Sequence, residues 1–307
     1  MLKLFLSIVA IVFFTNIVEA QDHPIEPSNI TQLILLGTGN PNPLPETAGP
    51  ATVIIVNDTP YIFDAGEGVM RRAEAARQKY KLKGLERTKF THLFLTHLHW
   101  DHTVGVPEVM MTPWTQGREG PLFVYGPTGT EHMAKSFLEA FRQDIAIRVK
   151  GLEPATRNGW QVEAIEFEGS YTYRDKNVTI EAFPVCHGDI ANAVGYKITT
   201  PDRVIVLSGD TSYCPIIAEK AKGADILVHE GYPSKSHAKL PADWSAYHTA
   251  FHTSGIDIAR IANASKPKLL VLYHHLAWQG DPVSWIADEI SETYDGKVVS
   301  GKDLDRF

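Results

Sequence analysis

The sequence predicts an α/β protein in which β-sheets are sandwiched between helices, and three observations favour this class. Short runs of β-branched and apolar residues recur along most of the chain. The early runs follow one another closely, as in hairpins, whereas the later ones alternate with helical patterns. The 307 residues are 44% apolar and 21% charged, an ordinary globular composition that can supply a sizeable core.

The first 20 residues are interpreted as a secretory signal peptide. Lys3 gives a positive start, residues 4–14 are apolar apart from Ser7, and Val18 and Ala20 put small residues before a cleavage site. The alternative is a membrane anchor, but a span needs about 20 apolar residues. We expect residues 1–20 to be removed, and one domain over residues 21–307 to be exported to the periplasm or the extracellular space without membrane attachment.

The expected strands are runs of β-branched, aromatic or aliphatic residues bounded by turn residues. They are 32–36, 52–56, 61–63, 92–95, 122–125, 161–167, 178–183, 194–198, 204–207, 226–228 and 269–272.

Helical patterns lie between some of these strands, at 69–78, 131–142, 256–264 and 282–292. Thr128 and Thr130 are candidate N-caps for the second of these helices, and Ser254 precedes the third. Asp281 is expected to cap the fourth helix, with Pro282 at its first position. Repeats, low-complexity tracts and linkers are absent from the sequence, which favours a single domain.

The charge balance argues against a stable nucleic-acid complex. Lys and Arg total 29 and Asp and Glu total 36, so the formal net charge is −7. Phosphate contacts need clustered basic residues. The two cysteines, Cys186 and Cys214, are too few for a disulfide framework. We interpret them as small apolar residues and leave their pairing open.

The strongest chemical signal is the segment HLHWDH at residues 97–102. Residues two apart in an extended chain face the same way, so His97 and His99 point to one side. Asp101 and His102 are expected in the following turn, aimed at a second point nearby. Imidazole and carboxylate ligands favour zinc, with manganese or iron as alternatives. The segment therefore predicts two neighbouring divalent metals that need further ligands from distant positions.

Three later segments place a metal-ligand residue directly after an expected strand. His187 follows the strand 178–183, and Asp210 follows the strand 204–207. His274 and His275 both follow the strand 269–272 and are both candidates. A ligand at the end of a rigid strand is typical of a metal site.

This order of ligands resembles that of the metallo-β-lactamase superfamily, over nearly the whole chain after residue 20. The resemblance implies an αβ/βα four-layer sandwich of two mixed β-sheets flanked by helices. The motifs are similar to those of the ribonuclease Z branch and its phosphodiesterase and arylsulfatase-like relatives. They are LGTGNP at 36–41, FDAGEG at 63–68, PVCH at 184–187, SGDT at 208–211, HE at 229–230 and HTS at 252–254.

The resemblance implies two zinc ions that share one carboxylate. The ligands would be His97, His99 and His187 for one ion, Asp101, His102 and His274 for the other, and Asp210 for both. His274 is preferred to His275 because it stands where the family's histidine follows its strand. Asp64 would orient the histidine loop, since ligating imidazoles need fixed partners, or it would cap the bend at 66–68.

The implied chemistry is hydrolysis by a metal-bridged hydroxide that attacks a phosphodiester. The metals would also stabilise charge that develops on the non-bridging oxygens. Asp101 would accept the hydroxide proton, and His252, held by Glu230, would protonate the leaving oxygen. The alternatives are that His252 caps the helix 256–264 and that Glu230 is a surface charge.

The substrate is less closely defined by the sequence. The segment 150–173 is short where ribonuclease Z carries its tRNA-gripping arm, and Leu276-Ala277-Trp278 replaces the family's R-Y pair. We therefore expect an exported dinuclear-zinc phosphodiesterase that acts on a small-molecule or nucleotide ester, and we allow for a homodimer. The enzymatic alternatives are a sulfatase, a lactonase or a β-lactamase of the same fold. A non-catalytic secreted binding protein is the alternative from another class, and the complete ligand set argues against it.

Four tryptophans lie beside these motifs: Trp100, Trp114, Trp244 and Trp278. They are candidates for the wall of an apolar pocket that receives an aryl or alkyl leaving group. The alternative is that they belong to the core.

Overall fold

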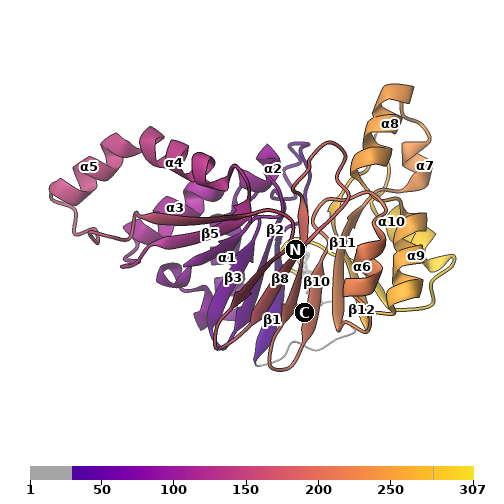
Figure 1. The fold of residues 1–307 in the computed structure, drawn as a ribbon, viewed down its shortest axis with the longest axis horizontal. Helices are drawn as coiled ribbons and strands as arrows, with labels where there is room; N and C mark the ends of the chain where they lie inside the picture. Colours follow the sequence, from indigo (N-terminus) through magenta and orange to yellow (C-terminus); the bar gives the residue numbers. More distant parts are fainter. Residues whose placement is uncertain (1–29, 279) are drawn as a thin grey trace, which may run out of the picture.

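The computed structural model describes residues 30–278 and 280–307. The expected signal peptide, residues 1–20, lies outside the described residues. Figure 1 shows two β-sheets packed face to face, with helices on their outer sides. Within the described residues, no helix combines the length and the apolar character that a membrane span requires.

The first sheet has the strand order β1-β2-β3-β4-β5-β6. Its strands are β1 (Thr31–Gly37), β2 (Ala51–Val56), β3 (Thr59–Phe63), β4 (His92–Phe94), β5 (Leu122–Pro127) and β6 (Val162–Phe167). The first three strands pair antiparallel and the last four pair parallel. Asn57 and Asp58 join β2 to β3 with φ values of 48° and 60°. Two successive left-handed residues are what a tight hairpin turn requires, and Asn and Asp tolerate them.

The second sheet has the order β13-β12-β11-β10-β9-β8-β7. Its strands are β7 (Tyr171–Arg174), β8 (Thr179–Pro184), β9 (Val194–Thr199), β10 (Val204–Leu207), β11 (Ile226–Gly231), β12 (Leu269–His275) and β13 (Val298–Ser300). The strands β7 to β10 pair antiparallel, and the strands β10 to β13 pair parallel. Both sheets are therefore mixed.

The core is divided into three apolar layers. Residues from both sheets, such as Leu33, Phe94, Tyr196 and Val228, form the layer between the sheets. The helices α1 (Val69–Tyr80) and α3 (Val106–Thr115) cover the outer face of the first sheet. The outer face of the second sheet is covered by α6 (Pro215–Lys220), α9 (Gly255–Ser265) and α10 (Ser284–Ser291). The prediction of an αβ/βα four-layer sandwich is confirmed.

Two expected helices have different bounds in the structure. The segment 131–142 belongs to two helices, α4 (Thr130–Ala140) and α5 (Arg142–Lys150). Gly129 occupies the N-cap of α4, and Thr130 Oγ1 instead donates to Pro127 O. The helix expected at 282–292 begins later, at Ser284, with Val283 at its N-cap, and the carboxylate of Asp281 pairs with Lys239 Nζ at 2.6 Å. The predicted caps of these two helices were wrong.

Several elements were not expected from the sequence. They are β7, β13, α2 (Trp100–Thr103), α3, α6, α7 (Ser234–His237), α8 (Ala242–Phe251) and the 3₁₀ turns Lys83–Leu85 and Arg87–Lys89. The helix α2 corrects a prediction, because Asp101 and His102 lie in this single helical turn and not in an irregular turn. Their backbone therefore has helical geometry, which fixes the directions of both side chains.

Candidate metal centre

The candidate ligands meet where strands of both sheets end. His97 and His99 follow β4, and Asp101 and His102 lie in α2 just beyond them. The second sheet supplies His187 after β8, Asp210 after β10 and His274 near the end of β12. The structure thus brings together side chains that are separated by more than half of the chain.

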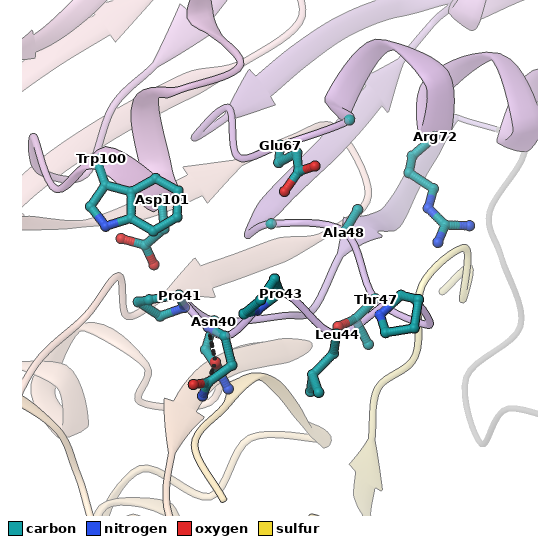
Figure 2. A pocket seen from close by; sticks show the side chains of 14 residues that line it. Asn40, Pro41, Pro43, Leu44, Thr47, Ala48, Glu67, Arg72, Trp100 and Asp101 are labelled. Carbon is teal, nitrogen blue, oxygen red and sulfur yellow. Dashed lines mark hydrogen bonds between the residues drawn. The ribbon is translucent and has the colours of Figure 1, made fainter.

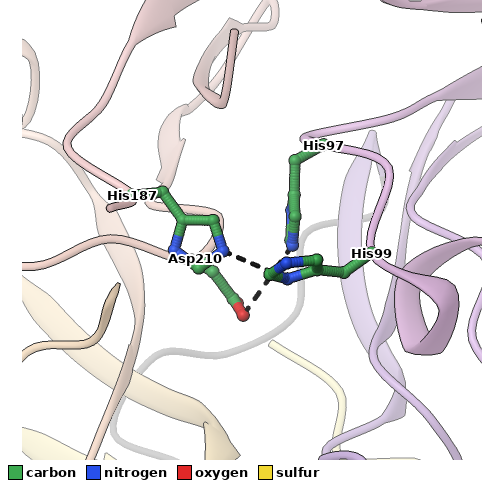
Figure 3. A group of neighbouring side chains, drawn as sticks. All are labelled: His97, His99, His187 and Asp210. Carbon is green, nitrogen blue, oxygen red and sulfur yellow. Dashed lines mark hydrogen bonds and ion pairs between the residues drawn. The ribbon is translucent and has the colours of Figure 1, made fainter. Parts of the chain in front are cut away.

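One cluster contains His97, His99, His187 and Asp210, whose candidate ligand atoms all lie within 4.8 Å of one another. Figure 3 shows the three imidazoles and the carboxylate converging from opposite sides. His187 Nε2 lies 3.2 Å from His99 Nδ1, and His97 Nε2 lies 4.0 Å from Asp210 Oδ2. Three of these side chains are buried and His99 is half-buried.

A second cluster contains Asp101, His102 and His274, again within 4.8 Å of one another. Asp210 Oδ2 lies 3.3 Å from His102 Nε2 and 3.5 Å from His274 Nε2. Asp210 therefore stands between the two clusters. His275 contributes to neither cluster; its Nε2 faces Ser300 Oγ at 3.3 Å.

The donor atoms fit a divalent metal centre. His97 Nε2, His102 Nε2 and Asp210 Oδ1 are buried without a hydrogen-bond partner among the described residues. A buried polar atom that lacks a partner costs about 1–3 kcal/mol, and bound metal would remove this cost. In several of the rings the opposite nitrogen is already held; His187 Nδ1, for example, donates to Phe251 O at 2.8 Å. Such fixed orientation is typical of metal-binding histidines.

The carboxylate of Asp64 orients the loop that carries His97 and His102. It accepts hydrogen bonds from Thr96 N at 2.8 Å, Thr96 Oγ1 at 2.8 Å and His102 Nδ1 at 2.9 Å. Thr96 Oγ1 in turn lies 2.9 Å from His97 Nδ1. One carboxylate thus orients a ring of each cluster. Asp64 and His274 have φ values of 58° and 44°, strained for residues other than glycine and typical of functional sites.

Burial and the mutual proximity of charges shift the pKa values of the cluster. Burial lowers the pKa of His187 to about 4 and holds that of His97 well below its usual range, so both rings are neutral at pH 7. Burial by itself raises the pKa of Asp210, but the imidazoles of His274 and His102 prevail and hold it well below its usual range. His97, His187 and Asp210 are thus in the forms that bind metal. Nearby carboxylates, Asp210 above all, outweigh burial and raise the pKa of His102 and His274, so these two rings would release a proton when metal binds.

Residues 59–275 match a family model described as a beta-lactamase superfamily domain. The chain belongs to the metallo-β-lactamase superfamily. Ribonuclease Z of Mycobacterium bovis (strain BCG / Pasteur 1173P2) is 30% identical over 280 residues, which cover 90% of this chain and 97% of the relative. Ribonuclease Z of Mycobacterium marinum is 30% identical over 283 residues, with the same shares of the two chains.

Solved structures agree with this superfamily fold. The metallo-β-lactamase fold protein YhfI from Bacillus subtilis has a TM-score of 0.68 and 17% identity, with 90% of this chain and 98% of that chain covered. Human tRNase Z, short form, has a TM-score of 0.65 and 20% identity, again with 90% and 98% covered. Together with the ribonuclease Z relatives, the fold identifies this superfamily member as a metal-dependent hydrolase.

The structure places His252 and Glu230 together beside the clusters. His252 Nδ1 lies 3.3 Å from Glu230 Oε2, and Glu230 Oε1 accepts a hydrogen bond from Thr253 N at 2.9 Å. Glu230 is fully buried, so it is not a surface charge, and burial beside Asp210 raises its pKa well above the usual range. His252 does not cap α9, because Ser254 Oγ accepts the hydrogen bond from Asp257 N at 3.1 Å.

His252 also forms a third candidate ligand group, with Asp210 and His274. Sequence reasoning did not anticipate this arrangement. The HTS motif at 252–254 marked the residue, but only the fold brings its ring to the metal side of Asp210, 3.9 Å from Oδ2.

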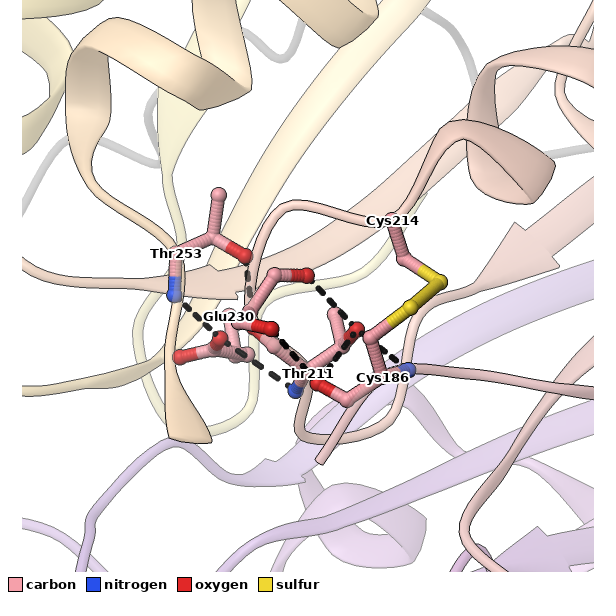
Figure 4. Close-up of a disulfide and its surroundings, with 6 residues drawn as sticks. Cys186, Thr211, Cys214, Glu230 and Thr253 are labelled. Carbon is pink, nitrogen blue, oxygen red and sulfur yellow. Dashed lines mark hydrogen bonds between the residues drawn. A yellow bond between two sulfur atoms is a disulfide. The ribbon is translucent and has the colours of Figure 1, made fainter. Parts of the chain in front are cut away.

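A disulfide joins Cys186 to Cys214, with their Cα atoms 5.6 Å apart (Figure 4). The interpretation of both residues as small apolar side chains was wrong. Cys186 directly precedes His187, and Cys214 closes the loop that begins at Asp210. Ser212 N donates to Cys186 O at 2.6 Å, so the two ligand-bearing loops are tied by backbone as well as by sulfur.

The four tryptophans do not share one pocket. Trp114 is fully buried, and its Nε1 donates to Thr156 O at 2.8 Å, so it belongs to the core. Trp100 lines a cavity of about 250 Å³ beside Asp101 and the loop that contains Asn40 (Figure 2). Trp244 and Trp278 line a second cavity, of about 460 Å³, which opens onto the metal clusters.

Proposed function

We propose that the protein is an exported phosphodiesterase that holds two zinc ions. The observation that carries this proposal is the position of Asp210, whose Oδ2 lies within 4.0 Å of ring nitrogens from both histidine clusters. Imidazole and carboxylate donors suit zinc. The relatives named ribonuclease Z support a phosphodiester as the bond that is cleaved.

Two bound ions would activate water and offset the charge that develops on the phosphoryl oxygens. His97, His99 and His187 would hold one ion, Asp101, His102 and His274 the other, and Asp210 both. Asp101 Oδ2, at 3.3 Å from His274 Nε2, is placed to take the proton of the attacking water. His252, fixed through Nδ1 by Glu230, would deliver a proton to the leaving oxygen from Nε2.

A small-molecule or nucleotide ester suits this protein better than a long nucleic acid. The two arginines of α5, which extends with α4 from one end of the sandwich in Figure 1, are engaged by neighbouring carboxylates. Arg142 Nε lies 3.2 Å from Glu139, and Arg148 Nε lies 2.9 Å from Asp144. Basic residues neutralised in this way offer little to a phosphate backbone, which supports the expectation of no stable nucleic-acid complex.

Export is supported by the signal-like residues 1–20 and by the Cys186–Cys214 disulfide, because disulfides persist mainly in oxidising compartments. We expect the exported protein to begin at Gln21. Mass spectrometry of material recovered outside the cytoplasm tests this, and an exported chain that still begins at Met1 would contradict cleavage.

The metal proposal is tested by replacement of the shared carboxylate. The wild-type protein should bind close to two zinc ions per chain, and Asp210→Ala should lose nearly all phosphodiester hydrolysis because both ions lose a ligand. Elemental analysis and rates with a bis-aryl phosphate provide the measurements. Asp288→Ala, an exposed position on α10, is the matched control and should retain both properties. Wild-type protein that binds no zinc would overturn the proposal, and a parallel screen with aryl sulfate, lactone and cephalosporin would show whether another ester or amide is preferred.

A further inference from the structure

The cavity of about 460 Å³ above the metal clusters has one polar side and one apolar side. Asp101, Asp210, His252 and His274 form the polar side. The apolar side consists of Leu240, Trp244, Tyr247, Leu276 and Trp278. Its volume lies in the range of small-ligand pockets, about 300–1,000 Å³. A substrate that reacts at the metal clusters must therefore place one substituent against an aromatic wall.

The helix α8 turns an aromatic face toward this cavity. Trp244, Tyr247, His248 and Phe251 are spaced three and four residues apart, so they lie on one face of the helix. Trp244 is 57% exposed and Tyr247 is 37% exposed, although both side chains are largely apolar. The two rings stand 5.8 Å apart at 86°. Aromatic side chains left open beside a reactive centre are suited to stacking with a planar ligand.

His248 supplies an unpartnered polar atom within this aromatic wall. Its side chain is only 7% exposed, yet Nδ1 has no hydrogen-bond partner among the described residues. Its ring lies 4.5 Å from that of Trp278 and is stacked on Trp244 at 24°. Because Nδ1 is itself covered, His248 contributes to the wall through its ring, which packs between the two tryptophans.

The wall also lacks the charges that a polyanion would need. Among the described residues that line the cavity, none is a lysine or an arginine. Negative charge beyond the reacting phosphate would therefore find no basic partner there. An uncharged planar group meets the available surface better.

We propose that this cavity binds a planar aromatic leaving group of a small phosphodiester, either an aryl alcohol or a nucleoside whose base enters the cavity. This inference rests on the proposed phosphodiesterase function. His252 lines the same cavity, which places the leaving oxygen on this side. In the reaction the oxygen of water bonds to phosphorus, the P–O bond to the aromatic alcohol breaks, and the leaving oxygen receives a proton.

The first test compares two methyl phosphodiesters whose leaving groups have matched acidity, one aryl and one fluorinated alkyl. We expect Trp244→Ala to lower kcat/KM for the aryl ester about fivefold to tenfold, mainly through KM, because one stacking partner is lost. The alkyl ester should change less than twofold. Phe141→Ala is the matched control, since the Phe141 side chain is 37% exposed, the same fraction as Tyr247, and lies outside the cavity lining. Tyr247→Ala should repeat the effect of Trp244→Ala.

A second arm measures binding without turnover. Calorimetric titration of the zinc-loaded protein should show phenylphosphonate binding about tenfold more tightly than methylphosphonate, and Trp244→Ala should remove most of this difference. A dinucleotide and its analogue without the leaving base distinguish a nucleobase from an aryl group as the occupant. Loss of rate on removal of the base assigns the cavity to nucleosides, and an aryl preference without a base preference assigns it to aryl esters.

The outcomes separate this inference from the function on which it rests. In one outcome, Trp244→Ala changes hydrolysis of the aryl and alkyl esters equally, and the protein binds both phosphonates equally. That result would overturn the aromatic cavity but would not contradict the phosphodiesterase function. Preferential binding of phenylphosphonate by a protein that hydrolyses no phosphodiester would support the cavity and overturn the proposed function.

Discussion

His252 has two candidate roles, proton donor and metal ligand, and experiment can distinguish them. Its ring is buried beside Glu230 and lines the cavity through which a leaving group would depart. Without metal, burial lowers the pKa of His252 to about 4. A proton donor at this position matters only when the leaving oxygen is basic, whereas a metal ligand matters for every substrate.

We therefore expect His252→Ala to slow alkyl phosphodiesters about 10²–10⁴-fold, the usual contribution of a general acid. Nitrophenyl esters, which leave without a proton, should change far less. His99→Ala should reduce both rates alike, since it removes a candidate metal ligand. Values of kcat/KM for a matched ester pair provide the measurement, with zinc content measured in each variant.

Equal losses on both esters for His252→Ala, together with lower zinc content, would instead assign His252 to the ligand group that it forms with Asp210 and His274. The acid role would then be withdrawn.

At the scale of elements, α9 begins one residue before the expected helix 256–264, and its N-cap is Ser254. Ser254 precedes the helix, and its Oγ accepts a hydrogen bond from Asp257 N at 3.1 Å. The helix then buries Ile258, Ile261 and Ala262 against the second sheet. A local cap therefore stabilises a helix that follows directly on the segment of His252.

Replacement of this cap by Ser254→Ala should lower the free energy of unfolding by about 1 kcal/mol, because the amide of Asp257 loses its acceptor. Urea denaturation followed by circular dichroism measures the change. Ser284→Ala is the matched control: Ser284 is exposed at the start of α10, where Val283 holds the N-cap position. Similar losses for both variants would show that the cap contributes no more than any exposed serine.

At the scale of the whole molecule, the disulfide links the loops that follow β8 and β10 in the second sheet. Cys186 follows β8 and Cys214 precedes α6, with a sequence separation of 28. The bond spans the region where His187 and Asp210 approach the histidines of the first sheet. It restricts the unfolded chain and holds the two loops in register.

Loss of this bond in a Cys186→Ser, Cys214→Ser double variant should lower the free energy of unfolding by about 3.5 kcal/mol, as expected for a loop of this length. Denaturant midpoints of the oxidised wild type, the reduced wild type and the double variant provide the comparison. The reduced wild type should behave like the double variant. A midpoint that is the same in all three would show that the bond does not stabilise the fold.

The sequence was sufficient for features that depend on neighbouring residues. Continuous apolar runs bounded by turn residues located most strands, because a strand between two apolar layers must be apolar along its length. The HLHWDH segment and the strand-end positions of His187, Asp210 and His274 pointed to one site, since the ends of strands are where scaffolds present ligands. The short elements β7, β13 and α7 escaped notice because three or four residues carry too little periodicity.

Only the tertiary structure decided features that depend on which distant segments meet. In the structure Glu230 is buried beside His252, and Cys186 is bonded to Cys214. Trp114 lies in the core, whereas Trp244 and Trp278 line one cavity. The sequence by itself determined the ligand types and their order along the chain, because the metal-binding chemistry resides in the side chains themselves. Their convergence required the packing of two sheets, since burial of apolar surface, and not any local preference, brings the strand ends of both sheets together.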